Sequence, residues 1–393
     1  MRAVIYGAGN IGRGFISRLF SESGYEITFI DVTAPLVDSL NREKRYPVRL
    51  LSPDSARDVW IENVSAVNGA DTEKTIEAIA GADIMATAVG VRILPVIAPV
   101  IAKGLKKRFG RNQKPLNIII CENLINADQL LRKLINENLD DGERKIADER
   151  TGLIEASIGC MVPIQTEMMK DGNALRICTE NYSRIPVDKK AFKGEIPEIR
   201  GMEAHESFGF FIERKLFIHN MGHGICAYFG LHLGDEYIWE TVNRPEILFM
   251  AENAMLESAL ALSEKYKTGI KDLHSHIADL LRRFSNKSLG DTCLRVGADT
   301  ARKLGEEDRF MGAIKCCRET NIKPLFISAG AAAAVFQHIK ENGAVQSPAE
   351  AAKILVNISN QGSDVSEMII GMYSRLCEKN ALQKITGHIM SLW

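Results

Sequence analysis

The pattern of apolar and polar positions divides the 393-residue chain into a mixed first half and a largely helical second half. The first apolar run, residues 3–6, has the length of a buried strand, and apolar side chains then recur at helical spacing over residues 15–20. Three further apolar runs, residues 27–30, 82–90 and 116–121, fit the strands of a parallel sheet covered on both faces. We therefore predict an alternating α/β structure for the first half.

Beyond Phe208 the spacing of apolar residues becomes helical, and few strand candidates remain. The predicted helices cover residues 213–233, 245–266, 271–284, 301–320, 325–341 and 348–358. Residues 151–200 are mixed, with strand-like alternation over residues 175–179 and prolines that mark loops. We predict an N-terminal Rossmann-type nucleotide-binding domain of residues 1–195, followed by a mostly α-helical C-terminal domain of residues 196–393.

A glycine-rich turn joins the first predicted strand to the first predicted helix. It has the spacing G-x-G-x-x-G and consists of Gly7, Ala8, Gly9, Asn10, Ile11 and Gly12. In dinucleotide-binding folds the first glycine permits the tight turn, the second lets the backbone approach a pyrophosphate, and the third allows close helix–strand packing. The helix N-terminus also offers unpaired N–H groups to the phosphates. The alternatives are a glycine-rich turn without a ligand, or FAD in place of NAD.

Asp31 ends the second predicted strand and lies 24 residues after Gly7, close to the spacing of about 20 expected for the acid that binds a ribose. Its carboxylate would accept hydrogen bonds from the ribose hydroxyls and would repel a 2′-phosphate, so the signal favours NAD over NADP. Thr87, Ala88 and Val89 close the next predicted strand. They complete the predicted cofactor site because a strand end that faces a cofactor needs small residues.

Asn123 follows the apolar run of residues 116–121. Groups just past the ends of parallel strands line the ligand crevice of such folds, so Asn123 is expected near the nicotinamide. The alternative is an asparagine that merely caps the following helix.

Composition excludes some classes of protein. The chain is 46% hydrophobic and 25% charged with a formal net charge of −1, and this balance argues against binding to nucleic acid through phosphate neutralisation. The eight cysteines include no Cys-x-x-Cys pair, and Met1-Arg2 leads directly into the first strand without a signal peptide. We therefore expect a reducing, cytoplasmic compartment. The longest apolar run, residues 330–336, is too short to span a membrane.

The predicted helix of residues 213–233 carries a polar face with most of the candidate chemistry. At about 100° per residue, His219 lies about 40° round the helix from Lys215, His223 about 80° and Asn220 about 140°. Apolar residues fill most of the opposite side. The alternative is a solvated face with a snorkelling lysine.

A zinc site is a further alternative, because His219 and His223 are four residues apart and His232 could supply a third ligand. No nearby acid completes a recognisable metal motif, so we predict no catalytic metal.

Several motifs resemble the polyol-specific long-chain (mannitol) dehydrogenase family, and within it the mannitol-1-phosphate 5-dehydrogenases. They lie at residues 7–16, 88–90, 93–99, 115–123, 212–223, 283–286, 295–297 and 302–304. The most specific of them is Lys-(x4)-Asn-(x2)-His, formed by Lys215, Asn220 and His223. The resemblance covers most of the chain. Its length favours the sugar-phosphate branch over the longer mannitol 2-dehydrogenases and hexuronate reductases.

The resemblance implies a metal-independent dehydrogenase in which Lys215 takes the hydroxyl proton as hydride leaves for the nicotinamide. Desolvation beside apolar surface would lower the pKa of this lysine towards the working pH. Asn123 and Asn220 would donate hydrogen bonds to the developing alkoxide, and His223 would hold the reacting oxygen. His219 is expected to be only a neighbour.

A second set of polar residues comes from the helical half: Arg283, Asn286, Arg295, Arg302 and Lys303. Arginines suit a substrate phosphate because they bind it bidentately, although each could equally form a structural ion pair. One departure concerns Pro163, which stands where the family pattern leads us to expect an aspartate. Gln165 or Glu167 could replace that acid.

The predicted reaction is therefore the NAD-dependent interconversion of mannitol 1-phosphate and fructose 6-phosphate. The alternatives are a dehydrogenase of an unphosphorylated polyol, a sugar acid or another sugar phosphate, or, from another class, a catalytically decayed NAD(H)-binding sensor. The family resemblance favours a monomer over an oligomer, and no nucleic-acid or membrane partner is expected.

Overall fold

The computed structural model describes residues 1–111, 114–359 and 363–392. The chain separates into two compact units, Met1–Phe208 and Gly209–Trp393. The units divide after Phe208, whereas the sequence-based domain boundary lies after residue 195.

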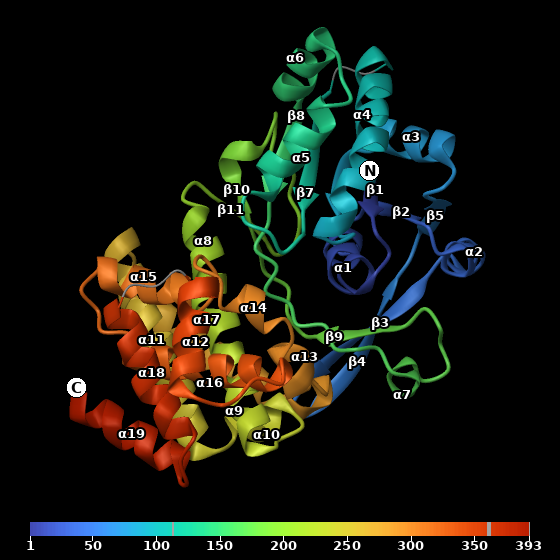
Figure 1. Ribbon diagram of the computed structural model, residues 1–393. Helices are drawn as coiled ribbons and strands as arrows, with labels where there is room; N and C mark the ends of the chain where they lie inside the picture. The colour runs from blue at the N-terminus through green and yellow to red at the C-terminus, as the bar shows by residue number, and fades with distance from the viewer. Residues whose placement is uncertain (112–113, 360–362, 393) are drawn as a thin grey trace. The chain divides into compact units, whose positions relative to one another are not determined.

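A six-stranded parallel sheet organises the N-terminal unit (Figure 1). Its strands are β1 (Arg2–Tyr6), β2 (Glu26–Asp31), β5 (Val64–Asn68), β6 (Ile84–Thr87), β7 (Leu116–Ile120) and β8 (Thr151–Glu155). They are ordered β5-β2-β1-β6-β7-β8, so the direction of winding reverses between β1 and β6. This is the strand order of doubly wound dinucleotide-binding folds, and it confirms the predicted Rossmann-type architecture.

Helices cover both faces of this sheet. They are α1 (Ser17–Ser21) with the π-helical turn Gly12–Ile16 before it, α2 (Ala34–Glu43), α3 (Thr72–Ala80), α4 (Leu94–Arg111), α5 (Ala127–Asn136) and α6 (Asp141–Arg150). Alternate residues of β1 point to opposite faces, as strand geometry requires: Ile5 packs in the core with Phe15, and Val4 packs in the core with Ile101. The continuous apolar run that predicted β1 therefore reflects burial on both sides.

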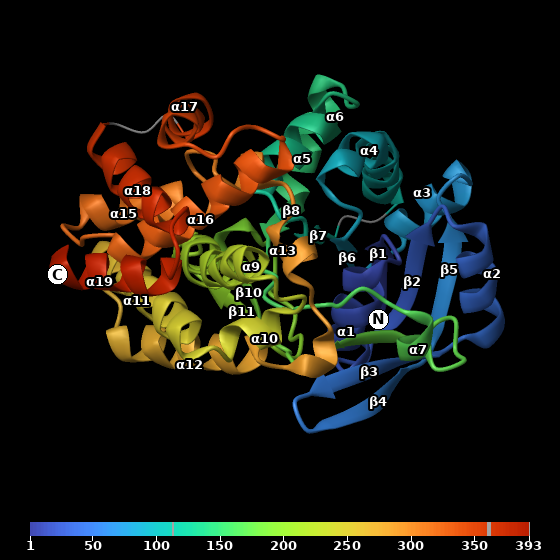
Figure 2. The same cartoon turned by 60° about the horizontal axis from the view of Figure 1, so that its bottom comes forward.

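A hairpin that the sequence analysis did not anticipate lies between α2 and β5. It consists of β3 (Tyr46–Ser52) and β4 (Ser55–Ile61), and β9 (Ile177–Glu180) joins β3 to make a three-stranded sheet (Figure 2). Four of the first five residues of β4 are exposed and polar or small, so no apolar run marks this strand. The remaining elements of the unit are β10 (Ile185–Asp188), β11 (Met202–His205), α7 (Glu167–Lys170) and the 3-10 turns Val91–Ile93 and Lys189–Ala191.

The C-terminal unit is helical, as predicted. Its elements are α8 (Gly209–Arg214), the π-helical turn Lys215–Asn220, α9 (Met221–Leu233), α10 (Ile238–Val242), α11 (Pro245–Tyr266), α12 (Ile270–Phe284), the 3-10 turn Lys287–Leu289, α13 (Cys293–Gly297), α14 (Thr300–Lys303), α15 (Met311–Glu319), α16 (Leu325–Glu341), α17 (Pro348–Ser359), α18 (Ser363–Leu376) and α19 (Ala381–Leu392). The long helix α9 contacts α11, α13 and α16. Glycines allow these close approaches, because a Cβ on Gly222 would lie 2.5 Å from the Met255 sulfur and one on Gly330 would lie 2.5 Å from Ile225.

One predicted helix is wrong. The stretch 301–320 is interrupted over residues 304–310, where Gly305 is followed by four charged residues, and only α14 and α15 are helical. By contrast, α11 and α16 have the predicted ends. Pro245 opens α11 at its first position, where a proline costs no hydrogen bond.

A buried glutamate caps α16. Both carboxylate oxygens of Glu257, on α11, accept backbone N–H groups at 3.0 Å, from Phe326 and Ile327. Burial raises the pKa of Glu257 to about 8 against the opposing effect of these hydrogen bonds. Burial likewise raises the pKa of Glu155 to about 7.

Stability is therefore expected to fall as the pH rises from about 4.5 to about 8, because the folded state keeps a proton on Glu257 that the unfolded chain has released. Over this pH range Glu257 would lower the free energy of unfolding by up to roughly 1.4 kcal/mol per pH unit. Glu257→Gln should flatten the pH dependence of the urea unfolding midpoint measured between pH 5 and pH 8. Glu252→Gln, an exposed position on the same helix, is the control. Parallel curves for all three proteins would contradict the assignment.

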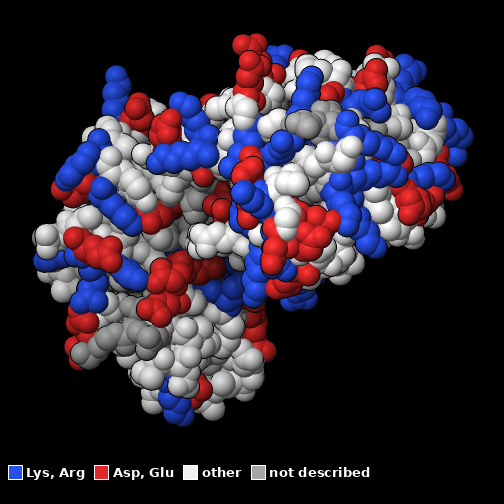
Figure 3. Space-filling model, turned by 90° about the horizontal axis from the view of Figure 1, so that it is seen from above, with Lys and Arg blue, Asp and Glu red and all other residues white. Residues whose placement is uncertain are grey.

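Three general properties follow from the described part of the chain. None of its helices has both the length and the apolar character needed to cross a membrane. All eight cysteines are free thiols, and only Cys377 is exposed. On the face shown in Figure 3, Lys and Arg side chains are interspersed with Asp and Glu, in keeping with the net charge of −1.

Candidate functional site

The glycine-rich turn has the geometry that its sequence predicts. Gly7 has a φ of +102°, and a Cβ there would lie 2.4 Å from the Ala88 carbonyl oxygen. A Cβ on Gly12 would lie 2.0 Å from the Gly7 carbonyl oxygen, so only glycine permits this packing. Gly9 differs because it is exposed and has no neighbouring atom within 4 Å of a Cβ position. The space at Gly9 is open for a ligand.

Asp31 fastens this turn to the end of β2. Its Oδ2 accepts a hydrogen bond from the Ala8 N–H at 2.8 Å, and its Oδ1 accepts one from the Thr33 N–H at 2.9 Å. The carboxylate therefore holds the glycine-rich turn in position at the end of β2. Its contact with a ribose stays a prediction. The side chain is half-buried.

A buried guanidinium, which the sequence analysis missed, supports the same turn. Arg13 donates from Nε to the Ala8 carbonyl at 2.6 Å and from Nη1 to the Leu175 carbonyl at 2.7 Å. Its side chain thus links the turn to the segment before β9. The apolar helical pattern of residues 15–20 gives no signal for this role.

Glu122 connects two strand ends at the cofactor edge of the sheet. Its carboxylate accepts the Thr87 hydroxyl at 2.6 Å and the Val89 N–H at 2.9 Å, and the side chain is buried. The Thr87 hydroxyl is therefore committed to Glu122 and is not exposed, while Ala88 and Val89 are half-buried. The sequence signal that could have identified Glu122 was its position directly after a predicted strand.

Glu122→Gln is expected to weaken NADH binding about tenfold. The substitution replaces one carboxylate oxygen by an NH₂ group that cannot accept a hydrogen bond, and one hydrogen bond to a charged group contributes roughly 1.5–3 kcal/mol. The measurement is NADH fluorescence titration, with the exposed Glu137→Gln as control. An unchanged dissociation constant with Glu122→Gln would show that the strand ends do not depend on this contact.

Asn123 is exposed just after β7, at the same sheet edge as Glu122. The alternative role as a helix cap is wrong, because the cap position of α5 is Asn126, with a φ of +57°. The first N–H group of α5, that of Ala127, donates to Glu155 at 2.8 Å. The substrate-facing role of Asn123 stays a prediction.

The two candidates for replacing an acid at Pro163 are engaged elsewhere. Pro163 is buried in the N-terminal unit. The Gln165 side chain exchanges hydrogen bonds with the backbone of Cys178, accepting from its N–H at 2.7 Å and donating to its carbonyl at 3.0 Å. Glu167 is exposed and pairs with Lys170 at 2.7 Å.

In the C-terminal unit, the polar stretch from Lys215 to Asn220 is a π-helical turn. The angles derived for a regular α-helix are therefore wrong over this stretch. Hydrogen bonds between residues five apart widen the turn. Lys215 and Asn220, which are five residues apart, therefore lie on one side of the helix, as residues four apart do in an α-helix. Both side chains are half-buried. π-Helical turns inside longer helices are frequent at functional sites.

The two histidines flank one aromatic ring. His223 stacks on Phe284 with 4.7 Å between ring centroids and 10° between planes, and His219 packs on the same ring at 5.6 Å. His219 is buried, and burial together with the nearby charges of Arg283, His276 and Lys215 lowers its pKa well below the usual value. A neutral, buried His219 agrees with its predicted role as a neighbour.

The three histidines of the zinc alternative do not form a ligand set. His232 lies nine residues beyond His223 along α9, roughly 13 Å of helix rise, and its ring packs edge-on against Phe336 at 4.9 Å. Within the described ranges no group of three or more His, Cys, Asp or Glu side chains has the arrangement of a metal site.

The predicted substrate residues have varied surroundings. Arg283 is buried and lies 3.4 Å from Asp279. Asn286 is buried and accepts the Ser288 N–H at 3.1 Å. Arg302 is bound by Asp299 at 2.6 Å and by Asp308 at 2.9 Å, which makes it a structural ion pair.

Lys303 and Arg309 are two buried cations of the C-terminal unit, and Arg309 lies at the end of the polar helix face. Lys303 donates to the Val296 carbonyl at 2.6 Å, and burial, with Arg309 and Arg302 nearby, lowers its pKa to about 8. Arg309 is buried and donates to the Asn220 carbonyl at 3.4 Å, so it touches the end of the π-helical turn. Arg309 is not among the residues predicted from the sequence; it lies within the stretch predicted to be regular helix.

Arg295 is paired with an aspartate that was also missed. Asp291 binds the Arg295 guanidinium through Oδ1, at 2.7 Å from Nε and 2.5 Å from Nη2. Its other oxygen, Oδ2, lies 3.3 Å from His223 Nε2. The signal for this ion pair in the sequence was an acid four residues before an arginine.

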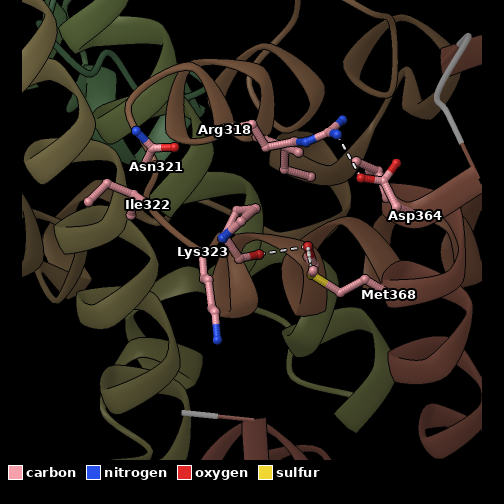
Figure 4. Close-up of a pocket in the computed structure, with 10 residues that line it drawn as sticks. Arg318, Asn321, Ile322, Lys323, Asp364 and Met368 are labelled. Atoms are coloured by element: carbon pink, nitrogen blue, oxygen red, sulfur yellow. Dashed lines mark hydrogen bonds and ion pairs between the residues drawn. The ribbon is translucent and has the colours of Figure 1, made fainter.

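A separate cavity of about 290 Å³ lies between α15, α16 and α18 (Figure 4). Arg318 and Asp364 pair across it at 2.6 Å, and Ser328 donates to the Pro324 carbonyl at 2.6 Å. None of the predicted site residues lines this cavity.

Two family models match the chain. The mannitol dehydrogenase Rossmann domain matches residues 1–201, and the mannitol dehydrogenase C-terminal domain matches residues 209–367. A mannitol-1-phosphate 5-dehydrogenase of Brevibacillus brevis is 36% identical over 362 residues, 92% of this chain and 91% of its own length. One of Geobacillus thermodenitrificans is 38% identical over 79% of this chain and 80% of its own length.

Solved structures share the fold at low sequence identity. A D-sorbitol dehydrogenase in substrate-free form superposes with a TM-score of 0.80 at 14% identity, covering 98% of this chain and 94% of its own. The Pseudomonas fluorescens mannitol 2-dehydrogenase, solved with NAD and D-mannitol, gives a TM-score of 0.75 at 13% identity, covering 100% of this chain and 94% of its own.

Proposed function

This chain belongs to the mannitol dehydrogenase family and is a polyol dehydrogenase, and we propose that it uses NAD to interconvert mannitol 1-phosphate and fructose 6-phosphate. Family membership confirms the resemblance recognised in the sequence. The observation that carries the finer proposal is the identity of 34–38% to proteins named mannitol-1-phosphate 5-dehydrogenase over most of the chain.

The described residues at the cofactor edge fit a dinucleotide. Gly9 leaves open space for a pyrophosphate, and Asp31 places a carboxylate where an NADP 2′-phosphate would be repelled. Bound NAD would supply the hydride acceptor for alcohol oxidation. The residues that would hold it are the glycine turn, Asp31 and the segment 87–89.

The proposed proton carrier is Lys215. Oxidising a secondary alcohol without a metal requires a base for the hydroxyl proton, and a half-buried amine on a π-helical turn is suited to the task. Asn220 and Asn123 would donate hydrogen bonds to the developing alkoxide, and His223 would bind the reacting oxygen. In the reverse direction protonated Lys215 would return the proton.

A phosphorylated substrate fits the charges of the C-terminal unit. Arg283 is close enough to His219 to contribute to lowering its pKa, and Arg295 is linked to His223 through Asp291. Lys303 and Asn286 are further buried polar groups of the same unit. Guanidinium groups can bind a phosphate through two parallel hydrogen bonds.

The decisive experiment is steady-state reduction of fructose 6-phosphate, fructose and tagaturonate in parallel, with NADH and with NADPH. We expect kcat/KM to be highest for fructose 6-phosphate with NADH. Equal use of the unphosphorylated ketose would overturn the proposed substrate, and a preference for NADPH would overturn the proposed cofactor. NADH binding without reduction of any ketose would favour the sensor alternative.

The free thiols support a reducing, cytoplasmic location, and we expect a monomer.

A further inference from the structure

Asp291 contacts two residues that the proposed reaction uses. It lies between the 3-10 turn Lys287–Leu289 and α13, and its side chain is 8% exposed. One carboxylate oxygen faces the His223 ring at 3.3 Å, and the other binds Arg295 at 2.5 and 2.7 Å. A single buried anion thus adjoins the proposed holder of the reacting oxygen and a proposed phosphate ligand.

The backbone around Asp291 is fixed on both sides. Its carbonyl accepts the Ile238 N–H at 2.9 Å, and the Cys293 N–H donates to the Glu236 carbonyl at 2.9 Å. The side chain of Thr292 caps α13. The backbone that carries the carboxylate is therefore held by the fold.

The His223 ring is fixed by packing. Stacking on Phe284 sets the plane of the imidazole, and this plane brings Nε2 to Asp291. The Nε2 atom is buried and makes no hydrogen bond within the described residues, so the carboxylate acts on it through charge at 3.3 Å. A negative charge beside Nε2 favours the tautomer with a proton there, which makes Nδ1 the acceptor nitrogen.

Asp291 is an anion at physiological pH. Burial alone would raise its pKa, but His223 and Arg295 outweigh burial and lower it. A buried aspartate that faces a histidine and binds an arginine resembles, in its physical role, the carboxylates that orient functional histidines in other enzymes.

We propose that Asp291 is a positioning residue that fixes the tautomer of His223 and the direction of the Arg295 guanidinium, and so aligns the reacting end and the charged end of one substrate. The inference rests on the proposed function. It assigns Asp291 no contact with the substrate.

The test compares Asp291→Asn with Asp235→Asn in the full-length protein. Asp235 is a matched control because its side chain is also 8% exposed and binds an arginine, Arg244, at 2.5 and 2.8 Å, but it contacts no predicted site residue. Asp291→Asn should lower kcat for ketose reduction about tenfold to a hundredfold, the size seen when the carboxylate partner of a metal-binding histidine is removed. It should also raise the KM of the phosphorylated ketose, with NADH affinity unchanged. Asp235→Asn should keep kcat and KM. Equal kcat losses in the two variants would overturn the proposal.

A double-mutant cycle separates positioning from general destabilisation. In a His223→Ala background Asp291→Asn should cost no further kcat, whereas additive losses would contradict action through His223. The ¹⁵N signals of His223 provide a readout that does not need turnover, since loss of the Nε2–H tautomer is expected in Asp291→Asn. If wild type reduces no ketose, the proposed function fails while these signals still decide the role of Asp291.

Discussion

Lys215→Ala is expected to lower kcat for ketose reduction by about 10³, within the range of 10² to 10⁴ that general acid–base catalysis contributes. The variant removes the amine that would exchange the substrate proton, while the cofactor residues of the N-terminal unit are untouched. NADH affinity, measured by fluorescence titration, should therefore stay within about twofold of wild type. A small primary amine added to the assay should restore part of the lost rate.

The matched control is Lys265→Ala, because Lys265 is a partly exposed lysine of the same unit that pairs with Glu213 at 2.7 Å. Its loss should leave kcat unchanged. Lys215→Arg should be nearly as slow as Lys215→Ala, since a guanidinium keeps its proton at working pH. Retention of more than a tenth of wild-type kcat in Lys215→Ala would remove Lys215 from the proposed mechanism.

Gly9→Ala is expected to raise the dissociation constant of NADH by about tenfold to a hundredfold without loss of stability. No protein atom lies within 4 Å of the added Cβ, so the folded chain accommodates it. The methyl group would occupy the space through which a pyrophosphate approaches the backbone, and forcing an extra methyl into a filled contact costs roughly 1–3 kcal/mol. The measurements are NADH titration and the thermal unfolding midpoint.

Two further glycines make this prediction specific. Gly110→Ala, on α4, also meets no atom within 4 Å, so it should leave NADH binding unchanged and should not lower the unfolding midpoint, since alanine favours a helix over glycine. Gly12→Ala places a Cβ 2.0 Å from the Gly7 carbonyl oxygen, so it should lower stability as well as NADH binding. Unchanged NADH affinity in Gly9→Ala would show that the dinucleotide does not bind against this turn.

The sequence determined the nucleotide half of the fold because its signals are local. A glycine with a φ of +102° and a helix that packs on a strand at Gly12 are required by neighbouring residues of the same turn. Burial of the central strands on both faces produced continuous apolar runs. The lysine, asparagine and histidine of the helix motif were likewise named from sequence, and their chemical roles stay predictions.

The tertiary structure decided the features that depend on distant residues. The π-helical turn at Lys215 accompanies the packing of Phe217 against α15, where a Cβ on Gly312 would lie 2.7 Å from the Phe217 ring. Such a contact cannot be read from periodicity. The pairing of β9 with β3 likewise joins segments that are far apart in the sequence.

Asp291 shows most clearly which contacts cannot be predicted from the sequence. Sixty-eight residues separate it from His223, and only the fold brings their side chains to 3.3 Å. Glu122 was visible as the neighbour of Asn123, but its contacts with the end of β6 required the sheet order. The sequence by itself therefore named the groups that are proposed to supply the chemistry. The tertiary structure decided which buried charges hold them, because buried charges are paired through contacts between distant segments.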